Sequence, residues 1–294
     1  MRAARKLRTP CLWGELYLPS GDQDKLAAVV ILSSSAGVCD IRERYYAGFF
    51  ASRGVAALAV DSFGPRGITE TITDQSRLAE DAMEKDAYAA FALLCAEERV
   101  DCRKIALMGV SLGGLAVLRT ALTVRRRMFA RPERDFAARA ALVPPCHIQQ
   151  RDARTDGRPL LVLLAEEDDY TGVVQPLMYV RRMREAGPAD IVLRVYPGAG
   201  HCWELAGRPV FLEAAENYSG CLWWQEDDGR LTEADSGRSM AQEEFVLRRR
   251  EFCALGAHAG GGGREIKQRA AEDILAFLEE RAGFSGAVLG RERT

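Results

Sequence analysis

The sequence has little histidine and no long apolar run. Of its 294 residues only three are histidines, namely His147, His201 and His258. No segment reaches the roughly 18 uninterrupted apolar residues that suggest a membrane-spanning helix. The basic start, MRAARKLRTPCLWGELYLP, has no apolar stretch of signal-peptide length. We therefore expect no membrane span and a cytoplasmic location.

Patterns for metal binding and disulfide bonding are also lacking. The eight cysteines are spread along the chain without a CxxC pair, so neither structural zinc nor a disulfide framework is expected. The formal net charge is only −2, which disfavours nucleic acid as a partner. These absences favour a small-molecule partner, and no metal or cofactor is expected.

Apolar runs of strand length alternate with longer helical patterns over much of the chain. The runs expected to form strands are 26–34, 55–61, 104–110, 138–145, 159–169 and 189–201. Strands buried on both faces of a parallel sheet read as continuous apolar runs. The alternation therefore predicts the α/β class, with a mostly parallel central sheet covered by helices on both faces, in a single domain over 1–294.

Periodicity predicts the helices and their buried faces. Residues 112–127 are expected to form one helix, and a closing amphipathic helix is expected at about 264–282. In the long helix before the 104–110 strand, AEDAMEKD (79–86) is expected to face water. The opposite, buried face is expected to comprise Leu78, Ala82, Ala89, Leu93 and Ala96.

The alternation breaks between about 205 and 263, a segment called the insertion below. Within it, CLWWQEDDGRL (221–231) is typical of two short strands around an Asp-Gly turn. We interpret the segment as an insertion rather than a second domain with its own core. Its aromatic residues, with Phe211, Trp223 and Trp224 among them, leave three roles open: a lid, a contact in a homodimer, or a surface hairpin.

One serine lies where a predicted strand meets a predicted helix. Gly109-Val110-Ser111-Leu112-Gly113 fits G-x-S-x-G, with KIALM before it and a helix rich in small residues after it. A tight turn at this place lifts the serine hydroxyl above the sheet edge, and the glycines keep neighbouring backbone from colliding with it. Ser111 is therefore the candidate nucleophile.

A serine nucleophile needs a base and a carboxylate that orients the base, and in this strand–helix context they follow in the order acid, then histidine. His201, which ends YPGAGH after an apolar run, is the candidate base. The acid is expected in AEEDDYTG, after the strand LLVLL. Asp168 is favoured there and Asp169 is the alternative.

Two backbone amides are expected to bind the developing oxyanion. One is the N–H of Leu112, which is expected to be the first residue of the helix after Ser111. The helix dipole favours negative charge at this end. The second donor is expected in the loop of small residues after the 26–34 strand, from the backbone of Ser35. Ser34 beside it and Trp203 after the candidate base are further candidates for contact with the substrate.

Taken together, several stretches resemble the dienelactone hydrolase branch of the α/β-hydrolase superfamily. They are VAALAVDSFGPRG (55–67), VDCRKIALMGVSLGG (100–114), ALVPPC (141–146), PLLVLLAEEDDYT (159–171) and YPGAGH (196–201). The resemblance implies the α/β-hydrolase fold and the triad Ser111, Asp168 and His201. Dienelactone hydrolases proper carry a cysteine nucleophile, so the serine is similar to that of their esterase-like relatives.

The resemblance also implies a substrate. Enzymes of this branch hold a substrate carboxylate with arginines, and Arg66 in DSFGPRG is the matching candidate. Its alternative is an ion pair with Asp61 or with a carboxylate on a helix. The expected function is hydrolysis of a small ester or lactone through an acyl-enzyme. The alternatives are acyl transfer or cyclisation by the same intermediate, and a non-catalytic binding protein of this fold.

Overall fold

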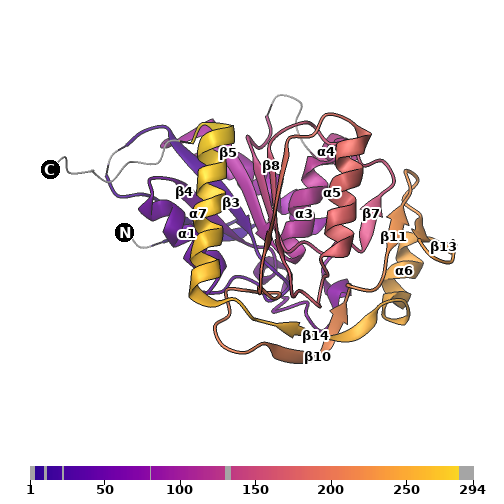
Figure 1. The fold of residues 1–294 in the computed structure, drawn as a ribbon. Helices are drawn as coiled ribbons and strands as arrows, with labels where there is room; N and C mark the ends of the chain where they lie inside the picture. The colour runs from indigo at the N-terminus through magenta and orange to yellow at the C-terminus, as the bar shows by residue number, and fades with distance from the viewer. Residues whose placement is uncertain (1–3, 10–11, 22, 80, 130–133, 285–294) are drawn as a thin grey trace.

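The computed structural model describes residues 4–9, 12–21, 23–79, 81–129 and 134–284 (Figure 1). Within these ranges an eight-stranded sheet has the order β1-β2-β4-β3-β5-β6-β8-β9. From β4 to β9 neighbouring strands are parallel, whereas β1 and β2 pair antiparallel at one edge. The strands are β1 (Arg5–Arg8), β2 (Trp13–Tyr17), β3 (Leu26–Leu32), β4 (Ala56–Asp61), β5 (Val100–Val110), β6 (Arg139–Leu142), β8 (Leu160–Ala165) and β9 (Ile191–Tyr196).

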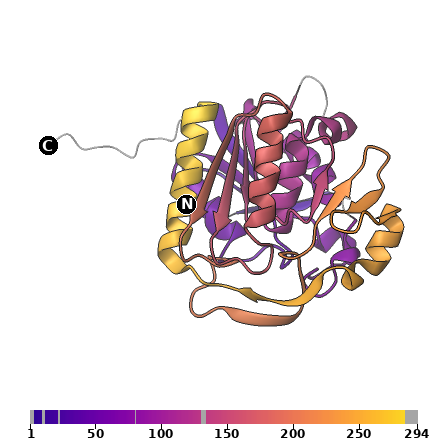
Figure 2. The ribbon, with the colours of Figure 1, turned by 45° about the vertical axis from the view of Figure 1, so that its right-hand side comes forward.

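Helices cover both faces of this sheet, and each covered face has its own core (Figures 1 and 2). Side chains alternate between the faces of a strand. In β3, Val30 therefore packs into the core under α2, α3 and α5, while Ile31 packs into the core under α1 and α7. The α/β class and the α/β-hydrolase architecture are confirmed. The helices are α1 (Glu43–Ser52), α2 (Ala82–Cys95), α3 (Leu112–Ala121), α4 (Thr123–Phe129), α5 (Val174–Ala186) and α7 (Gly263–Ala282).

The face predicted for α2 is right in part. Leu78 and Ala82 are buried, and Ala89 and Leu93 pack half-buried against the same core, but Ala96 is exposed. Glu84 and Asp86, which were expected to face water, are buried. Glu84 accepts hydrogen bonds from Arg125 at 2.7 and 3.1 Å and forms an ion pair with Arg119 at 2.8 Å. Buried charges persist when they are paired, and periodicity within one helix cannot show partners that lie elsewhere in the chain.

Residues 112–127 form two helices, not the single helix predicted. The backbone leaves the helical conformation at Leu122, where ψ is 132°. Around this point the chain bonds to a neighbouring loop, because the N–H of Thr123 donates to Arg154 O at 2.8 Å and Asp156 N–H donates to Ala121 O at 2.9 Å. A long-range contact of this kind leaves no local signal.

No disulfide framework was expected, yet the part of the chain that the structure describes contains two disulfide bonds. Disulfides join Cys95 to Cys102 and Cys221 to Cys253. The second pair is separated by 32 residues, so only the folded insertion brings the two thiols together. Because disulfides persist mainly in oxidising compartments, this finding gives no support to the cytoplasmic location. No helix in the described ranges is both long and apolar enough to span a membrane.

The insertion adds two small sheets beside the main one, visible below and to the right in Figure 1. β10 (Val210–Asn217) pairs with β14 (Ala254–Ala259). The other sheet begins on β7 (Ile148–Gln150), outside the insertion, and continues through β11 (Trp223–Gln225), β12 (Leu231–Glu233) and β13 (Ser239–Met240). The short helix α6 (Gln242–Arg248) follows. Ile148 packs with four buried insertion residues, namely Trp223, Leu231, Met240 and Phe245.

Candidate active site

Ser111 lies on a strained turn between β5 and α3. Its φ is 54°, a left-handed conformation that is uncommon for residues other than glycine. A Cβ at Gly109 would lie 2.3 Å from the backbone oxygen of Gly113, and a Cβ at Gly113 would lie 2.6 Å from Ser33 O. Both glycines of the motif are therefore required by close approach of backbone to backbone, as the sequence indicated.

The three residues chosen from the sequence lie in hydrogen-bonding contact. His201 Nε2 is 3.0 Å from the Ser111 hydroxyl oxygen, and His201 Nδ1 is 2.8 Å from Asp168 Oδ2. All three side chains are buried. They come from three loops at the carboxyl ends of β5, β8 and β9, which meet at one edge of a parallel sheet.

The structure also separates Asp168 from Asp169. Asp168 accepts bonds from the backbone N–H of Tyr170 and of Thr171 and from the Thr171 hydroxyl, besides its contact with His201. Burial alone would raise the pKa of Asp168, but His201 and the Thr171 donors hold that pKa below its usual value. Asp169 is half exposed and instead contacts His258 at 2.7 Å.

The two amides expected to bind an oxyanion belong to residues that line one pocket with Ser111. Leu112 and Ser35 are both part of its wall. Beside Ser35, the backbone N–H of Ser34 donates to the buried Glu43 carboxylate at 3.2 Å. The loop is thus held by a carboxylate at the start of α1, which sequence reasoning did not single out.

A buried arginine joins this loop to the loop of His201. The Arg42 guanidinium donates to Glu43 at 2.8 Å, to the Ser34 hydroxyl at 2.5 Å and to Cys202 Sγ at 2.9 Å. Cys202 directly follows His201. Arg42, which is 3 % exposed, therefore bonds both to Ser34 beside the candidate oxyanion amide and to Cys202 beside the candidate base.

Three residues expected to contact substrate have other partners. Arg66 forms a bidentate ion pair with Asp86 of α2, at 2.8 and 2.9 Å, which is the helix-carboxylate alternative raised from the sequence. Ser34 is bonded to Arg42 as described. Trp203 is fully buried in the core with α1 and α7, where its indole N–H donates to Tyr46 at 3.3 Å. In the part of the chain that the structure describes, none of the three lines the pocket.

The pocket beside Ser111 measures about 780 Å³ out to its open mouth. The insertion supplies part of its wall through Tyr218, Phe245 and Arg249. The other side chains that line it are Ser35, Gln75, Leu78, Ala79, Met83, Ser111, Leu112, Leu115, Ala116, Arg119, Pro145, His147, Ile148, Tyr170 and Thr171.

The glycine run at the end of the insertion packs directly on the loop of His201. The N–H of Gly260 donates to His201 O at 2.6 Å, and Gly200 N–H donates to Gly261 O at 2.5 Å. A Cβ at Gly200 would lie 2.3 Å from Gly260 O. The run therefore supports the candidate base, a role that its composition alone did not indicate.

Sequence reasoning missed several residues around the site. Thr171 bonds to Asp168 and lies in the loop where the acid was expected, but it was not singled out. Arg42 and Glu43 lie at a helix start that carries no motif. His147 lies in the pocket wall, a place that was not predicted for it. Within the described ranges, no group of three or more histidine, cysteine, aspartate or glutamate side chains is arranged to hold a metal ion.

Comparisons with known proteins agree with this architecture. The sequence model of the dienelactone hydrolase family matches residues 14–226. No curated protein matches the sequence. Among solved structures, Thermogutta terrifontis esterase 2 phosphoramylated by tabun is 20% identical with a TM-score of 0.56, over 71% of this chain and 88% of that one.

Two other solved structures are similar. A Klebsiella pneumoniae protein provisionally named a dienelactone hydrolase is 17% identical with a TM-score of 0.57, over 68% of this chain and 87% of that one. MGS-M1, an α/β hydrolase from a deep-sea metagenome library of the Medee basin, is 16% identical with a TM-score of 0.52, over 70% and 85%. At these identities the structural likeness supports the fold.

Proposed function

Because the chain belongs to the dienelactone hydrolase family and is a carboxylic ester hydrolase, we propose that it cleaves a small ester or lactone by a serine acyl-enzyme mechanism. Ser111 is the nucleophile, His201 the base and Asp168 the acid that orients His201. The observation that carries the proposal is the hydrogen-bonded chain Ser111–His201–Asp168, with distances of 3.0 and 2.8 Å.

In this mechanism His201 Nε2 takes the proton of the Ser111 hydroxyl as the oxygen attacks the ester carbonyl. The oxyanion of the tetrahedral intermediate accepts hydrogen bonds from the N–H of Leu112 and of Ser35. His201 then gives its proton to the departing alkoxide, and the acyl group remains on Ser111. Water, deprotonated by His201, attacks the acyl-enzyme. His201 then gives this proton to the Ser111 oxygen as the bond to the acyl group breaks, which releases the free acid and restores the Ser111 hydroxyl.

Asp168 serves this cycle in two ways. Its carboxylate accepts the Nδ1–H of His201, so Nε2 is left to accept the serine proton. It also stabilises the imidazolium that forms during attack. The donors from Tyr170 and Thr171 keep Asp168 in place and ionised, which supports its assignment over Asp169.

The decisive experiment compares the wild-type protein with Ser111→Ala, using p-nitrophenyl acetate and butyrate and a fluorophosphonate probe. The related Thermogutta esterase has been solved with organophosphates attached, and the proposal places such an adduct on Ser111 here. Wild-type protein should turn over both esters and be labelled, and the variant should do neither. Turnover that survives in Ser111→Ala would contradict the proposal.

Product analysis separates hydrolysis from acyl transfer. Free acid as the sole product in the presence of added alcohols is expected for a hydrolase. A transferase would give the new ester as the main product instead.

A further inference from the structure

Two hydrogen-bonding side chains in the pocket wall have no partner within the described chain. Nδ1 of His147 and the hydroxyl of Tyr170 are buried without a hydrogen bond among the described residues. Each side chain is 6% exposed and lines the same pocket as Ser111. Buried polar groups are nearly always bonded, so a pair of them at one pocket indicates groups kept for a ligand.

The imidazole of His147 is held rigidly in that wall. It stacks on Tyr218 with ring centroids 3.8 Å apart and an angle of 4° between the planes. Tyr218 is fixed in turn, because its hydroxyl donates to Glu216 at 2.8 Å and its backbone N–H donates to Tyr170 O at 2.8 Å.

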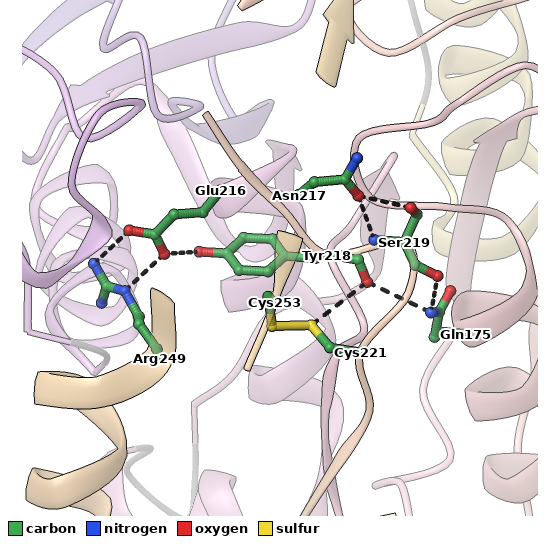
Figure 3. Close-up of a disulfide and its surroundings, with 8 residues drawn as sticks. All are labelled: Gln175, Glu216, Asn217, Tyr218, Ser219, Cys221, Arg249 and Cys253. Carbon is green, nitrogen blue, oxygen red and sulfur yellow. Dashed lines mark hydrogen bonds and ion pairs between the residues drawn. A yellow bond between two sulfur atoms is a disulfide. The ribbon is translucent and has the colours of Figure 1, made fainter. Parts of the chain in front are cut away.

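The disulfide Cys221–Cys253 of the insertion lies next to Tyr218. Tyr218 packs with Cys221 and Cys253 in one buried cluster. Figure 3 shows Tyr218 beside this disulfide, with its hydroxyl directed at Glu216 and Arg249. A rigid ring loses little conformational freedom when it binds a ligand group.

The charges around this part of the pocket are compensated. Arg119 is paired with Glu84 at 2.8 Å, and Arg249 with Glu216 at 2.7 Å and with Asp74 at 3.0 Å. Burial, together with the nearby Arg249 and Arg119, lowers the pKa of His147 to about 3. The ring is therefore neutral at any ordinary pH, and the pocket offers hydrogen bonds without an uncompensated positive charge.

Much of the remaining pocket lining is apolar, with Leu78, Met83, Leu115, Ala116, Ile148 and Phe245. We propose that His147 and Tyr170 form a polar subsite that binds a neutral oxygen of the ester substrate, in a ketone, ether or hydroxyl group. The subsite favours such a substrate over its hydrocarbon equivalent and over its carboxylate equivalent. The inference rests on the proposed function, because the subsite serves the ester that Ser111 attacks.

The test uses three p-nitrophenyl esters of matched shape: the heptanoate, the 6-oxoheptanoate and the adipate monoester. They carry a methylene, a ketone and a carboxylate at corresponding places. A second series carries the same three groups on the alcohol of acetate esters and is followed by titration of the released acid. In at least one series, kcat/KM for the ketone should exceed that of the other two members by about tenfold, since a lost hydrogen bond to a buried group has about this effect.

Variants then assign the preference to the two residues. His147→Phe keeps an aromatic ring against Tyr218 but removes both ring nitrogens. Tyr170→Phe removes the tyrosine hydroxyl. Each should bring the ketone-to-hydrocarbon ratio of kcat/KM to about threefold or less, because kcat/KM for the ketone ester falls more than that for the hydrocarbon ester. The matched control, Tyr88→Phe, removes a half-buried hydroxyl that bonds to Asp135 at 3.5 Å and should keep the wild-type ratio.

The outcomes are separable from those of the proposed function. Equal kcat/KM for all three members in both series, or preference for the carboxylate, would overturn the subsite while turnover still depended on Ser111. A preference that persists in both phenylalanine variants would overturn it as well. If His147→Phe does not fold, Tyr170→Phe alone decides. Turnover that survives Ser111→Ala would instead refute the proposed mechanism.

Discussion

The insertion and the rest of the described chain, called the frame here, are held together by different interactions. All seven residues of β3 in the frame are buried, and two extensive apolar cores flank the sheet. In the insertion, β11 has only three residues. Four buried side chains of the insertion form a small cluster with Ile148. There the disulfide Cys221–Cys253 and the ion pair of Arg249 with Glu216 supplement a small apolar core.

The two regions also contribute different residues to the candidate site. The frame carries Ser111, Asp168 and His201, whereas the insertion supplies Tyr218, Phe245 and Arg249 to the pocket wall. A change in the catalytic part of the frame should therefore slow the reaction of every ester. A change in the insertion should alter which esters react.

Replacing Asp168 by Asn should lower kcat by about 10³-fold or more for all esters, because the amide no longer holds His201 in the required tautomer. The matched control is Asp169→Asn, which changes a half-exposed neighbour that contacts His258. Its kcat should stay within about threefold of the wild-type value. Steady-state kinetics with p-nitrophenyl acetate measures both, and a larger loss in the control would make Asp169 the acid.

Arg42→Met should lower kcat by about 10²-fold with little change in KM, because small displacements of catalytic groups have effects of this size. The change removes three hydrogen bonds that link the Ser34 loop to Cys202 beside His201. Arg44→Met is the control, since Arg44 forms ion pairs with the partly buried Glu15 and the exposed Asp40, and among the described residues its side chain bonds to neither Ser34 nor Cys202.

Titration of active sites with the fluorophosphonate probe separates two explanations for Arg42. A positioning role lowers the labelling rate while every site is still labelled at completion. If Arg42→Met instead reduces the number of labelled sites and leaves their rate unchanged, the residue serves stability alone. Ser34→Ala and Cys202→Ala remove single bonds of the same set and should each give smaller losses.

The contact of Ser111, His201 and Asp168 could be predicted because the segments that hold them leave local signals. Ser111 sits in a motif whose glycines are required by backbone contacts of 2.3 and 2.6 Å. The strands around it are continuous apolar runs, so the loops that hold Asp168 and His201 could be placed at the sheet edge. Here local pattern and tertiary structure agree.

The remaining features depend on contacts between distant segments. Glu84 looked solvated because its partners, Arg119 and Arg125, lie on other helices. Cys221 and Cys253 pair only once the insertion has folded. Arg42 gains its role from Cys202, 160 residues away in the chain. Periodicity and short motifs describe neighbours in sequence, so they could not indicate these pairs.

Replacing both Cys221 and Cys253 by Ser should change the selectivity between esters more than the turnover of the smallest ester. The 32-residue separation corresponds to a loss of about 3 to 4 kcal/mol in the free energy of unfolding by the chain-entropy estimate. Loosening of Tyr218 should lower kcat/KM for p-nitrophenyl hexanoate by about tenfold and for the acetate by less than threefold. The measurements are thermal unfolding and the hexanoate-to-acetate ratio.

The frame disulfide provides the control for that experiment. Cys95 and Cys102 are separated by only 7 residues. Replacing both by Ser should therefore lower the free energy of unfolding less and leave the hexanoate-to-acetate ratio unchanged. An equal change of ratio in both double variants would mean that selectivity follows overall stability, and the division between frame and insertion would fail.

The smallest effect is expected at the contact between His258 of β14 and Asp169, beside the candidate acid. Both side chains are about half exposed, and exposed ion pairs contribute at most about 1 kcal/mol. The backbone N–H of His258, which donates to Asp169 at 2.9 Å, is retained in His258→Asn. We therefore expect kcat/KM for p-nitrophenyl acetate within about twofold of wild type. A loss near that of Asp168→Asn would show that the insertion takes part in the chemistry itself, because this contact joins it to the loop of Asp168.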